Sequence, residues 1–228
     1  MFKIHPSVIV NSLAVLAGAA LGLILGKSIP DTLRKVLFQA VGLTTIGIGI
    51  KMTLETSDFI VVLLSLAMGV VVGELLRIED RIAAVGKISK DSSRFAKGLV
   101  TAVTLFLVGP MTIVGSVRAG LVKDGTLIYI KSVLDFISSI ILASLYGLSV
   151  LVTSIVVLLV QGFLVLFSSQ LVFLTDKAYL ANFTGAGGLI VIAIGIRLLE
   201  IKDIRVGNFL PALFFTPVVD LVARMISK

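Results

Sequence analysis

Two ionisable residues lie inside an apolar run that predicts a membrane helix. Lys131 and Asp135 are four residues apart, so their side chains share one helix face, and Ser138 lies close to that stripe. Charged side chains within a span are costly and usually face a bundle interior or an aqueous cavity. The pair therefore predicts either a structural ion pair or a group that takes part in ion or proton coupling. Because Lys131 lies about one turn into the helix, its amine can alternatively extend to the outer surface.

A second group interrupts an apolar run at Gly109 and Pro110, with Thr112 and Ser116 following. Proline lacks a backbone donor and clashes with the preceding helical turn. The carbonyl groups released in hydrocarbon must be satisfied by protein, water or a bound solute. A helix that restarts after the proline would direct free N–H groups of Thr112 and Ile113 into the bundle, where they suit an anion or a polar ligand. The alternative is a kink closed by neighbouring helices, with Thr112 and Ser116 bonding back to their own helix.

Polar residues also stand before two later helices. Asn182 and Thr184 lead into a stretch that contains three glycines, residues 185–188, and Asn208 precedes the last apolar run. Short polar side chains commonly cap helices, which is the structural interpretation. The glycines also allow an unwound half-helix with Asn182 and Thr184 as ligands. The candidate substrate-binding or ion-binding residues are Gly109, Pro110, Thr112, Ser116, Lys131, Asp135, Ser138, Asn182, Thr184 and Asn208.

Several kinds of chemistry lack the residues that they need. The chain has no cysteine and one histidine, His5, which argues against disulfides, thiolate chemistry, haem, zinc and histidine-based catalysis. The glycine pairs are not a phosphate loop, because no strand precedes them and no Gly-Lys-Ser/Thr triplet follows. We expect no metal, no cofactor and no catalytic residue. A serine–lysine dyad keeps an intramembrane enzyme open as the least favoured alternative.

The candidate residues lie in apolar runs long enough to cross a bilayer. Of the 228 residues, 57% are apolar and 14% charged, whereas soluble domains have about 45–50% and about 25%. A hydrocarbon core of about 30 Å takes roughly 20 helical residues. We predict an all-α, polytopic membrane bundle of about eight spans with a broken span four. The spans are expected at roughly 8–26, 36–53, 59–76, 98–120, 127–147, 150–173, 183–199 and 208–225.

The positive charge indicates topology rather than a nucleic-acid partner. The net charge is +7, but the basic residues lie in short loops between apolar runs, as the positive-inside rule describes. The extended polar segment, residues 77–97, is therefore predicted to be a cytoplasmic basic loop. With eight spans both termini lie outside, and twelve basic residues fall inside against seven outside. No cleavage site follows the first apolar run, so we expect that run to be a retained span.

Two segments of the chain resemble one another. Residues 40–51 align without gaps on residues 186–197 and are identical at seven of twelve positions, with Lys51 matched by Arg197. These are spans two and seven, which cross the membrane in opposite senses, as in the inverted repeats of secondary transporters. Chance similarity between helices rich in glycine and isoleucine is the alternative. The repeat would relate spans 1–3 to spans 6–8.

One transmembrane domain over residues 1–228 is expected. It would contain repeat 1 at about 8–76, the basic loop 77–97, central spans at 98–147 and repeat 2 at about 150–225. Gly18, Gly22 and Gly26 form two overlapping small-xxx-small steps that permit close helix packing. This face could also join copies of the chain in a homo-oligomer.

Three segments together resemble a known family. Thr104–Ser116, the Lys131–Asp135 segment, and Gly187–Ile190 with Asn208–Leu213 are similar to the bacterial membrane family catalogued as domain of unknown function 554. The resemblance extends over nearly the whole chain, and its most specific element is Gly-Pro-Met-Thr-Ile-Val-Gly-Ser. It implies a multi-pass protein of the bacterial cytoplasmic membrane and implies no activity.

The leading functional prediction is a transporter or channel for a small solute or ion. Its centre would be the broken span four and the Lys131–Asp135 pair, placed near the membrane midplane, because polar chemistry is concentrated at mid-span. The rival is a structural or regulatory membrane protein that docks partners through the basic loop 77–97. The expected partners of a transporter are the lipid bilayer and a small solute or ion, not nucleic acid.

Overall fold

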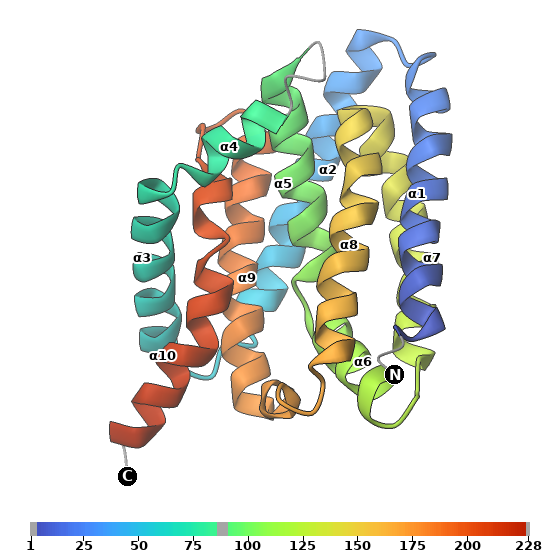
Figure 1. Cartoon of the computed structure of the whole chain (residues 1–228). Helices are drawn as coiled ribbons and strands as arrows, with labels where there is room; N and C mark the ends of the chain where they lie inside the picture. The colour runs from blue at the N-terminus through green and yellow to red at the C-terminus, as the bar shows by residue number, and fades with distance from the viewer. Residues whose placement is uncertain (1–3, 86–90, 227–228) are drawn as a thin grey trace. The chain divides into compact units, whose positions relative to one another are not determined.

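The fold comes from a computed structural model that describes residues 4–85 and 91–226, so part of the predicted loop 77–97 lies outside the described residues. The described residues form ten α-helices and two short 3-10 helices (Figure 1), which confirms the all-α prediction. The helices are α1 (Pro6–Gly26), α2 (Asp31–Thr53), α3 (Phe59–Leu75), α4 (Ile78–Val85), α5 (Ser92–Leu107), α6 (Pro110–Leu121), α7 (Thr126–Tyr146), α8 (Leu148–Leu166), η2 (Val172–Thr175), α9 (Lys177–Leu198), η3 (Val206–Phe209) and α10 (Ala212–Ile226).

The predicted set of about eight spans is confirmed. In the described part of the chain, six helices are long and apolar enough to cross a membrane, and two bent helix pairs meet the same criterion together. Counting each pair as one span gives up to eight. The α5–α6 pair is bent by 59° at the predicted break, so span four is broken as expected. The other pair, α3 with α4, is bent by 50°.

Several helix boundaries differ from the predicted spans; α5, for example, begins at Ser92 rather than at residue 98. Span six was expected to reach residue 173, but α8 ends at Leu166 because polar residues, among them Ser169 and Gln170, interrupt the apolar run, and η2 follows. Span seven was expected from residue 183, but α9 already begins at Lys177. Its N-cap is Asp176, which accepts a hydrogen bond from the backbone N–H of Ala178 at 3.1 Å.

The chain divides into two compact units. Unit 1 comprises residues 1–34 and 86–175, and its described helices are α1, α5, α6, α7 and α8 with η2. Unit 2 comprises residues 35–85 and 176–228, with most of α2, and α3, α4, α9 and α10 with η3. This division combines the first span with spans four to six, and spans two and three with the last two, so it does not follow the order of the predicted segments.

Unit 1 is built on close packing between α1 and α7. A Cβ atom at Gly18 or Gly22 would collide with the backbone of Phe136 or Ile140, and one at Gly26 with the backbone of Ser144. The contact positions rise together along both helices, so α1 and α7 run parallel, and α8 packs beside them (Figure 1). The glycine steps thus serve packing within the chain. A second copy could bind this face only by displacing α7.

Unit 2 uses glycines in the same way, between antiparallel helices. A Cβ at Gly49 of α2 would lie 2.7 Å from the carbonyl oxygen of Gly188 in α9. A Cβ at Gly195 would lie 2.8 Å from the carbonyl oxygen of Gly42. Because the higher-numbered glycine of α2 meets the lower-numbered glycine of α9, the two helices run in opposite directions. Elsewhere in the unit, α3 packs against α10.

Candidate functional site

Lys131 and Asp135 form a buried ion pair inside α7. The Nζ atom of Lys131 lies 2.6 Å from Oδ1 and 2.7 Å from Oδ2 of Asp135. The two side chains are 8% and 6% exposed. Lys131 therefore does not extend to the outer surface, because its amine turns towards the carboxylate one turn further along the helix. The amine also lies 5.8 Å from the ring centre of Phe106, within cation–π range.

Two buried amides extend this ion pair into α1 and α8. Asn11 Nδ2 donates to Asp135 Oδ2 at 3.1 Å and to Gln161 Oε1 at 3.2 Å. Both amide residues are 0% exposed. Each lies five residues from an end of its helix, which is roughly 8 Å at 1.5 Å per residue. Asn11, Lys131, Asp135 and Gln161 are called the Lys131 network below.

The hydrogen bonds of Asn11 and Gln161 determine which of their amide atoms have no partner. A carboxylate only accepts, so Asn11 must turn its NH2 group to Asp135, and Gln161 must turn its oxygen to that NH2 group. Asn11 Oδ1 and Gln161 Nε2 remain, and neither has a hydrogen-bond partner among residues 4–85 and 91–226. Buried polar groups are normally paired, and an unpaired one costs about 1–3 kcal/mol. The Lys131 network is thus open, with one unused acceptor and one unused donor group.

The break between α5 and α6 lies at Gly109, whose φ of 153° is a conformation that favours glycine. Thr112 Oγ1 donates to the carbonyl oxygen of Phe106 at 3.0 Å, so one carbonyl at the end of α5 is satisfied by protein. The backbone N–H groups of Thr112 and Ile113 donate to the Gly109 carbonyl at 3.2 and 3.5 Å. The prediction that these two N–H groups are free is therefore wrong, because the turn after Pro110 engages them.

The serine residues of the candidate set differ in their surroundings. Ser116 of α6 is 0% exposed, and its hydroxyl has no partner in the described part of the chain; the same holds for Thr104 of α5. Ser138 is half-buried, and no hydrogen bond joins it to the pair among the described residues. Its neighbour Ser139 is buried and donates to the backbone carbonyl of Asp135 at 2.6 Å.

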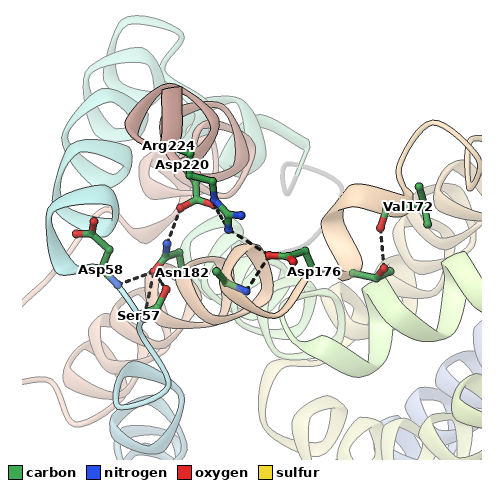
Figure 2. Close-up of polar contacts among 9 residues, drawn as sticks. Ser57, Asp58, Val172, Asp176, Asn182, Asp220 and Arg224 are labelled. Carbon is green, nitrogen blue, oxygen red and sulfur yellow. Dashed lines mark hydrogen bonds and ion pairs between the residues drawn. The ribbon is translucent and has the colours of Figure 1, made fainter. Parts of the chain in front are cut away.

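Asn182 belongs to unit 2 and forms a network of its own (Figure 2). Its Oδ1 accepts hydrogen bonds from Ser57 N at 3.2 Å, Ser57 Oγ at 2.9 Å and Asp58 N at 2.9 Å. Its Nδ2 donates to Asp220 Oδ1 at 2.8 Å. The other oxygen of Asp220 accepts from Arg224 Nε at 3.1 Å. Asn182 thus closes the turn before α3 and holds α10.

The predicted half-helix at residues 185–188 is wrong. α9 is continuous from Lys177 to Leu198, and Asn182 lies within it rather than before it. The glycines instead permit close packing: a Cβ at Gly188 would lie 2.6 Å from the backbone nitrogen of Thr53, and one at Gly185 would collide with Thr56. Thr184 is 2% exposed, and its hydroxyl has no partner in the described ranges.

Asn208 lies in η3, in a second closed network of unit 2. Its Oδ1 accepts from the backbone N–H of Glu79 at 2.9 Å, and its Nδ2 donates to Glu74 Oε2 at 2.5 Å. Arg197 pairs with Glu79 Oε1 at 2.6 Å, and Arg205 pairs with Glu74 Oε1 at 2.8 Å. Asn208 therefore ties η3 to the α3–α4 bend.

Comparison with known proteins places the chain in a family. The family model "Protein of unknown function (DUF554)" matches residues 6–221. The chain belongs to the DUF554 family. It is 34% identical over 219 residues to "Uncharacterized membrane protein YdfK" of Bacillus subtilis (strain 168), covering 94% of this chain and 95% of that protein. It is 31% identical over 214 residues to "Uncharacterized protein YqgA" of Escherichia coli (strain K12), covering 90% and 91%. No solved structure matches.

The family resemblance predicted from the sequence is confirmed, and so is the location. This DUF554 protein is a multi-pass bacterial membrane protein, since a relative carries the name of a membrane protein and several apolar helices could span a bilayer. The family description names no activity.

The polar networks of the two units differ in whether the buried amide atoms all have hydrogen-bond partners. In unit 2, the side-chain oxygen and the side-chain nitrogen of Asn182 are both bonded to protein, and so are those of Asn208. In unit 1, the Lys131 network leaves two buried amide atoms unpaired. Closed networks fix a fold, whereas an open one is prepared for something further to bind. The candidate site of this DUF554 protein is therefore the Lys131 network.

Sequence reasoning missed several members of these networks, three of which lie inside apolar helices. Asn11, Gln161 and Asp220 are buried, at 0%, 0% and 4% exposure, and none was selected from the sequence. The available signal was position alone: each is a strongly polar residue within an otherwise apolar run, which marks a residue with a partner or a role. Spacing did not help, because Asn11 lies 124 residues from Asp135 and 150 from Gln161.

Proposed function

We propose that the protein is a transporter or channel that moves a small solute or ion across the bacterial cytoplasmic membrane. The observation that carries the proposal is the Lys131 network: a buried ion pair and two buried amides with unused hydrogen-bonding groups, inside helices that could span the membrane. Intramembrane ionisable groups are costly and typically mark solute or ion pathways. In a purely structural network the great majority of buried polar groups are paired.

The packing of α2 on α9 supports an inverted repeat, a common transporter architecture. In the repeat alignment, Gly42 corresponds to Gly188 and Gly49 to Gly195. The contacts in unit 2 join Gly42 with Gly195 and Gly49 with Gly188. If each glycine is replaced by its counterpart in the alignment, the Gly42–Gly195 contact becomes the Gly188–Gly49 contact. A two-fold axis between two antiparallel helices requires this relation. Repeats related by an axis in the membrane plane underlie alternating access in many transporters.

The rival function, docking of partners through the basic loop 77–97, has less support. Two acids of that segment are engaged in the fold: Glu79 pairs with Arg197 at 2.6 Å, and Asp80 pairs with Arg205 at 2.6 Å. The described start of the segment is thus committed to unit 2. Reaction chemistry also has no support, so we propose that the protein is not an enzyme.

Flux into vesicles tests the proposal. Purified protein reconstituted in phospholipid vesicles should accelerate the entry of K⁺, Cl⁻ or urea over protein-free vesicles. Combining Lys131→Met with Asp135→Leu removes the buried pair without leaving a lone charge, and the flux should fall to the protein-free rate. If none of the three probes enters faster with the native chain, or the variant keeps native flux, the proposal is contradicted.

An exposed ion pair provides the matched control. Arg118 and Asp124 lie 2.7 Å apart at the α6–α7 turn, with side chains 55% and 30% exposed. Hydrogen bonds from Thr126 and then Arg118 lower the pKa of Asp124 to about 2, so this pair is charged throughout the neutral range. Combining Arg118→Met with Asp124→Leu also removes one positive and one negative charge. Flux through this control should remain native.

A further inference from the structure

The Lys131 network has no net charge. Lys131 contributes one positive charge and Asp135 one negative charge, and the amides of Asn11 and Gln161 are neutral. Both oxygens of Asp135 already lie within 2.7 Å of the Lys131 amine. An ion that reached this depth would give up its hydration shell without meeting an uncompensated charge of opposite sign. The network is therefore poorly suited to an ion.

The unused groups instead match a neutral molecule. Asn11 Oδ1 can only accept a hydrogen bond, and Gln161 Nε2 can only donate one. The two side chains are themselves hydrogen-bonded at 3.2 Å, so both groups belong to one contact between α1 and α8. A solute that carries both a donor and an acceptor offers the two kinds of group that these atoms lack. Amides and polyols are small solutes of this kind.

On the basis of the proposed function, we infer that the solute is a neutral polar molecule of the amide or polyol class, recognised by Asn11 Oδ1 and Gln161 Nε2. The solute donates to the Asn11 oxygen and accepts from the Gln161 nitrogen, which completes the hydrogen bonding of two residues that are 0% exposed. Lys131 and Asp135 act as positioning residues, because Asp135 fixes the orientation of the Asn11 amide at 3.1 Å.

The experiment follows the re-swelling of proteoliposomes by stopped-flow light scattering after a jump in urea or glycerol concentration, with K⁺ and Cl⁻ entry followed by ion-sensitive dyes. We expect urea or glycerol entry several-fold faster than in protein-free vesicles, with K⁺ and Cl⁻ unchanged. Gln161→Met keeps the side-chain length but removes the donor, so entry should fall to the protein-free rate. The matched control is Gln170→Met, at an exposed glutamine beyond the end of α8, and it should keep native entry.

Each other result has a defined meaning. Accelerated K⁺ or Cl⁻ entry without accelerated urea or glycerol entry overturns this inference and leaves the proposed function standing. Acceleration of none of the probes contradicts both. Faster water efflux alone means that the two groups hold water only, and native entry through Gln161→Met removes the site from the path; either result overturns the inference. If Gln161→Met does not fold, the native chain still decides between neutral solute and ion, and Gln161→Asn, with a shorter amide, should slow entry.

Discussion

Residue spacing predicted the ion pair between Lys131 and Asp135 but not the other partner of Asp135. The i,i+4 spacing predicted the pair, and the structure confirms it at 2.6 Å. The spacing did not reveal the amide of Asn11, because that residue reaches Asp135 across 124 positions of sequence. Local spacing is visible in a single sequence, whereas contacts between distant spans depend on the packing of the whole bundle.

Breaking the pair from one side should be costly. In Asp135→Asn the buried Lys131 loses its counter-charge, and stranding one partner of a buried pair costs about 3–5 kcal/mol. We expect the melting midpoint in detergent to fall by on the order of 10 °C. Adding Lys131→Met should restore most of the loss, which the same melting curve measures. An Asp135→Asn variant as stable as the native chain would show that the pair is not charged in the folded protein.

Open and closed amides should respond differently to apolar replacement. Gln161→Met removes the unpaired Nε2 atom, which is a gain, and the Oε1 atom that accepts from Asn11, which is a loss, so stability should change by less than about 1–3 kcal/mol. Asn182 Oδ1 accepts three hydrogen bonds, so Asn182→Leu strands the donors of Ser57 and Asp58 and should lower stability. Melting of the two variants side by side is the measurement. Equal losses in both would contradict the distinction between open and closed networks.

At the scale of elements, apolar run length predicted the spans well because a bilayer imposes it. The ends were predicted less well. The α9 start was misplaced because Asp176, not Asn182, is its cap. The segment from residue 78 was assigned to a loop because it is charged, yet it forms α4, since Glu79 is buried against Arg197. Polar composition does not distinguish a loop from a helix whose charges are paired within the fold.

Two glycines in one helix test the α2–α9 packing. A Cβ at Gly49 would lie 2.7 Å from the Gly188 carbonyl oxygen, whereas a Cβ at Gly47 would meet no atom within 4 Å. We therefore expect Gly49→Ala to destabilise the protein. Gly47→Ala should be neutral or stabilising, because alanine favours a helix by up to about 1 kcal/mol over glycine. Thermal melting of both variants gives the answer, and similar midpoints would contradict the close contact.

At the scale of the whole molecule, the sequence predicted the membrane class, the family and an all-α fold. The membrane class follows from composition alone, and the family follows from the motifs. The sequence did not predict the two units, since their members are far apart in the chain: unit 1 joins residues 1–34 to residues 86–175. The glycines at positions 42, 49, 188 and 195 lie in the two similar segments of the sequence, and in unit 2 Gly42 contacts Gly195 and Gly49 contacts Gly188.

Topology follows from the eight-span count and the distribution of basic residues. Arg81 lies in α4 on the predicted cytoplasmic side, and Ser169 lies after α8 on the predicted outer side; both are exposed. The native chain has no cysteine, so single thiols can be labelled without background. An impermeant thiol reagent added to whole cells should label Ser169→Cys but not Arg81→Cys. Labelling of both from the same side would refute the span count and the inverted repeat together.

The most direct test of the central claim asks whether water reaches the Lys131 network. Asn11→Cys introduces a thiol of similar size at a residue that is 0% exposed, and a transport path must open this position to water during its cycle. Ser65→Cys is the control, because Ser65 is also 0% exposed but belongs to unit 2. With folded protein in membranes, a small hydrophilic thiol reagent should modify Asn11→Cys and not Ser65→Cys. Protection of Asn11→Cys until the protein unfolds would contradict a transport path through the Lys131 network.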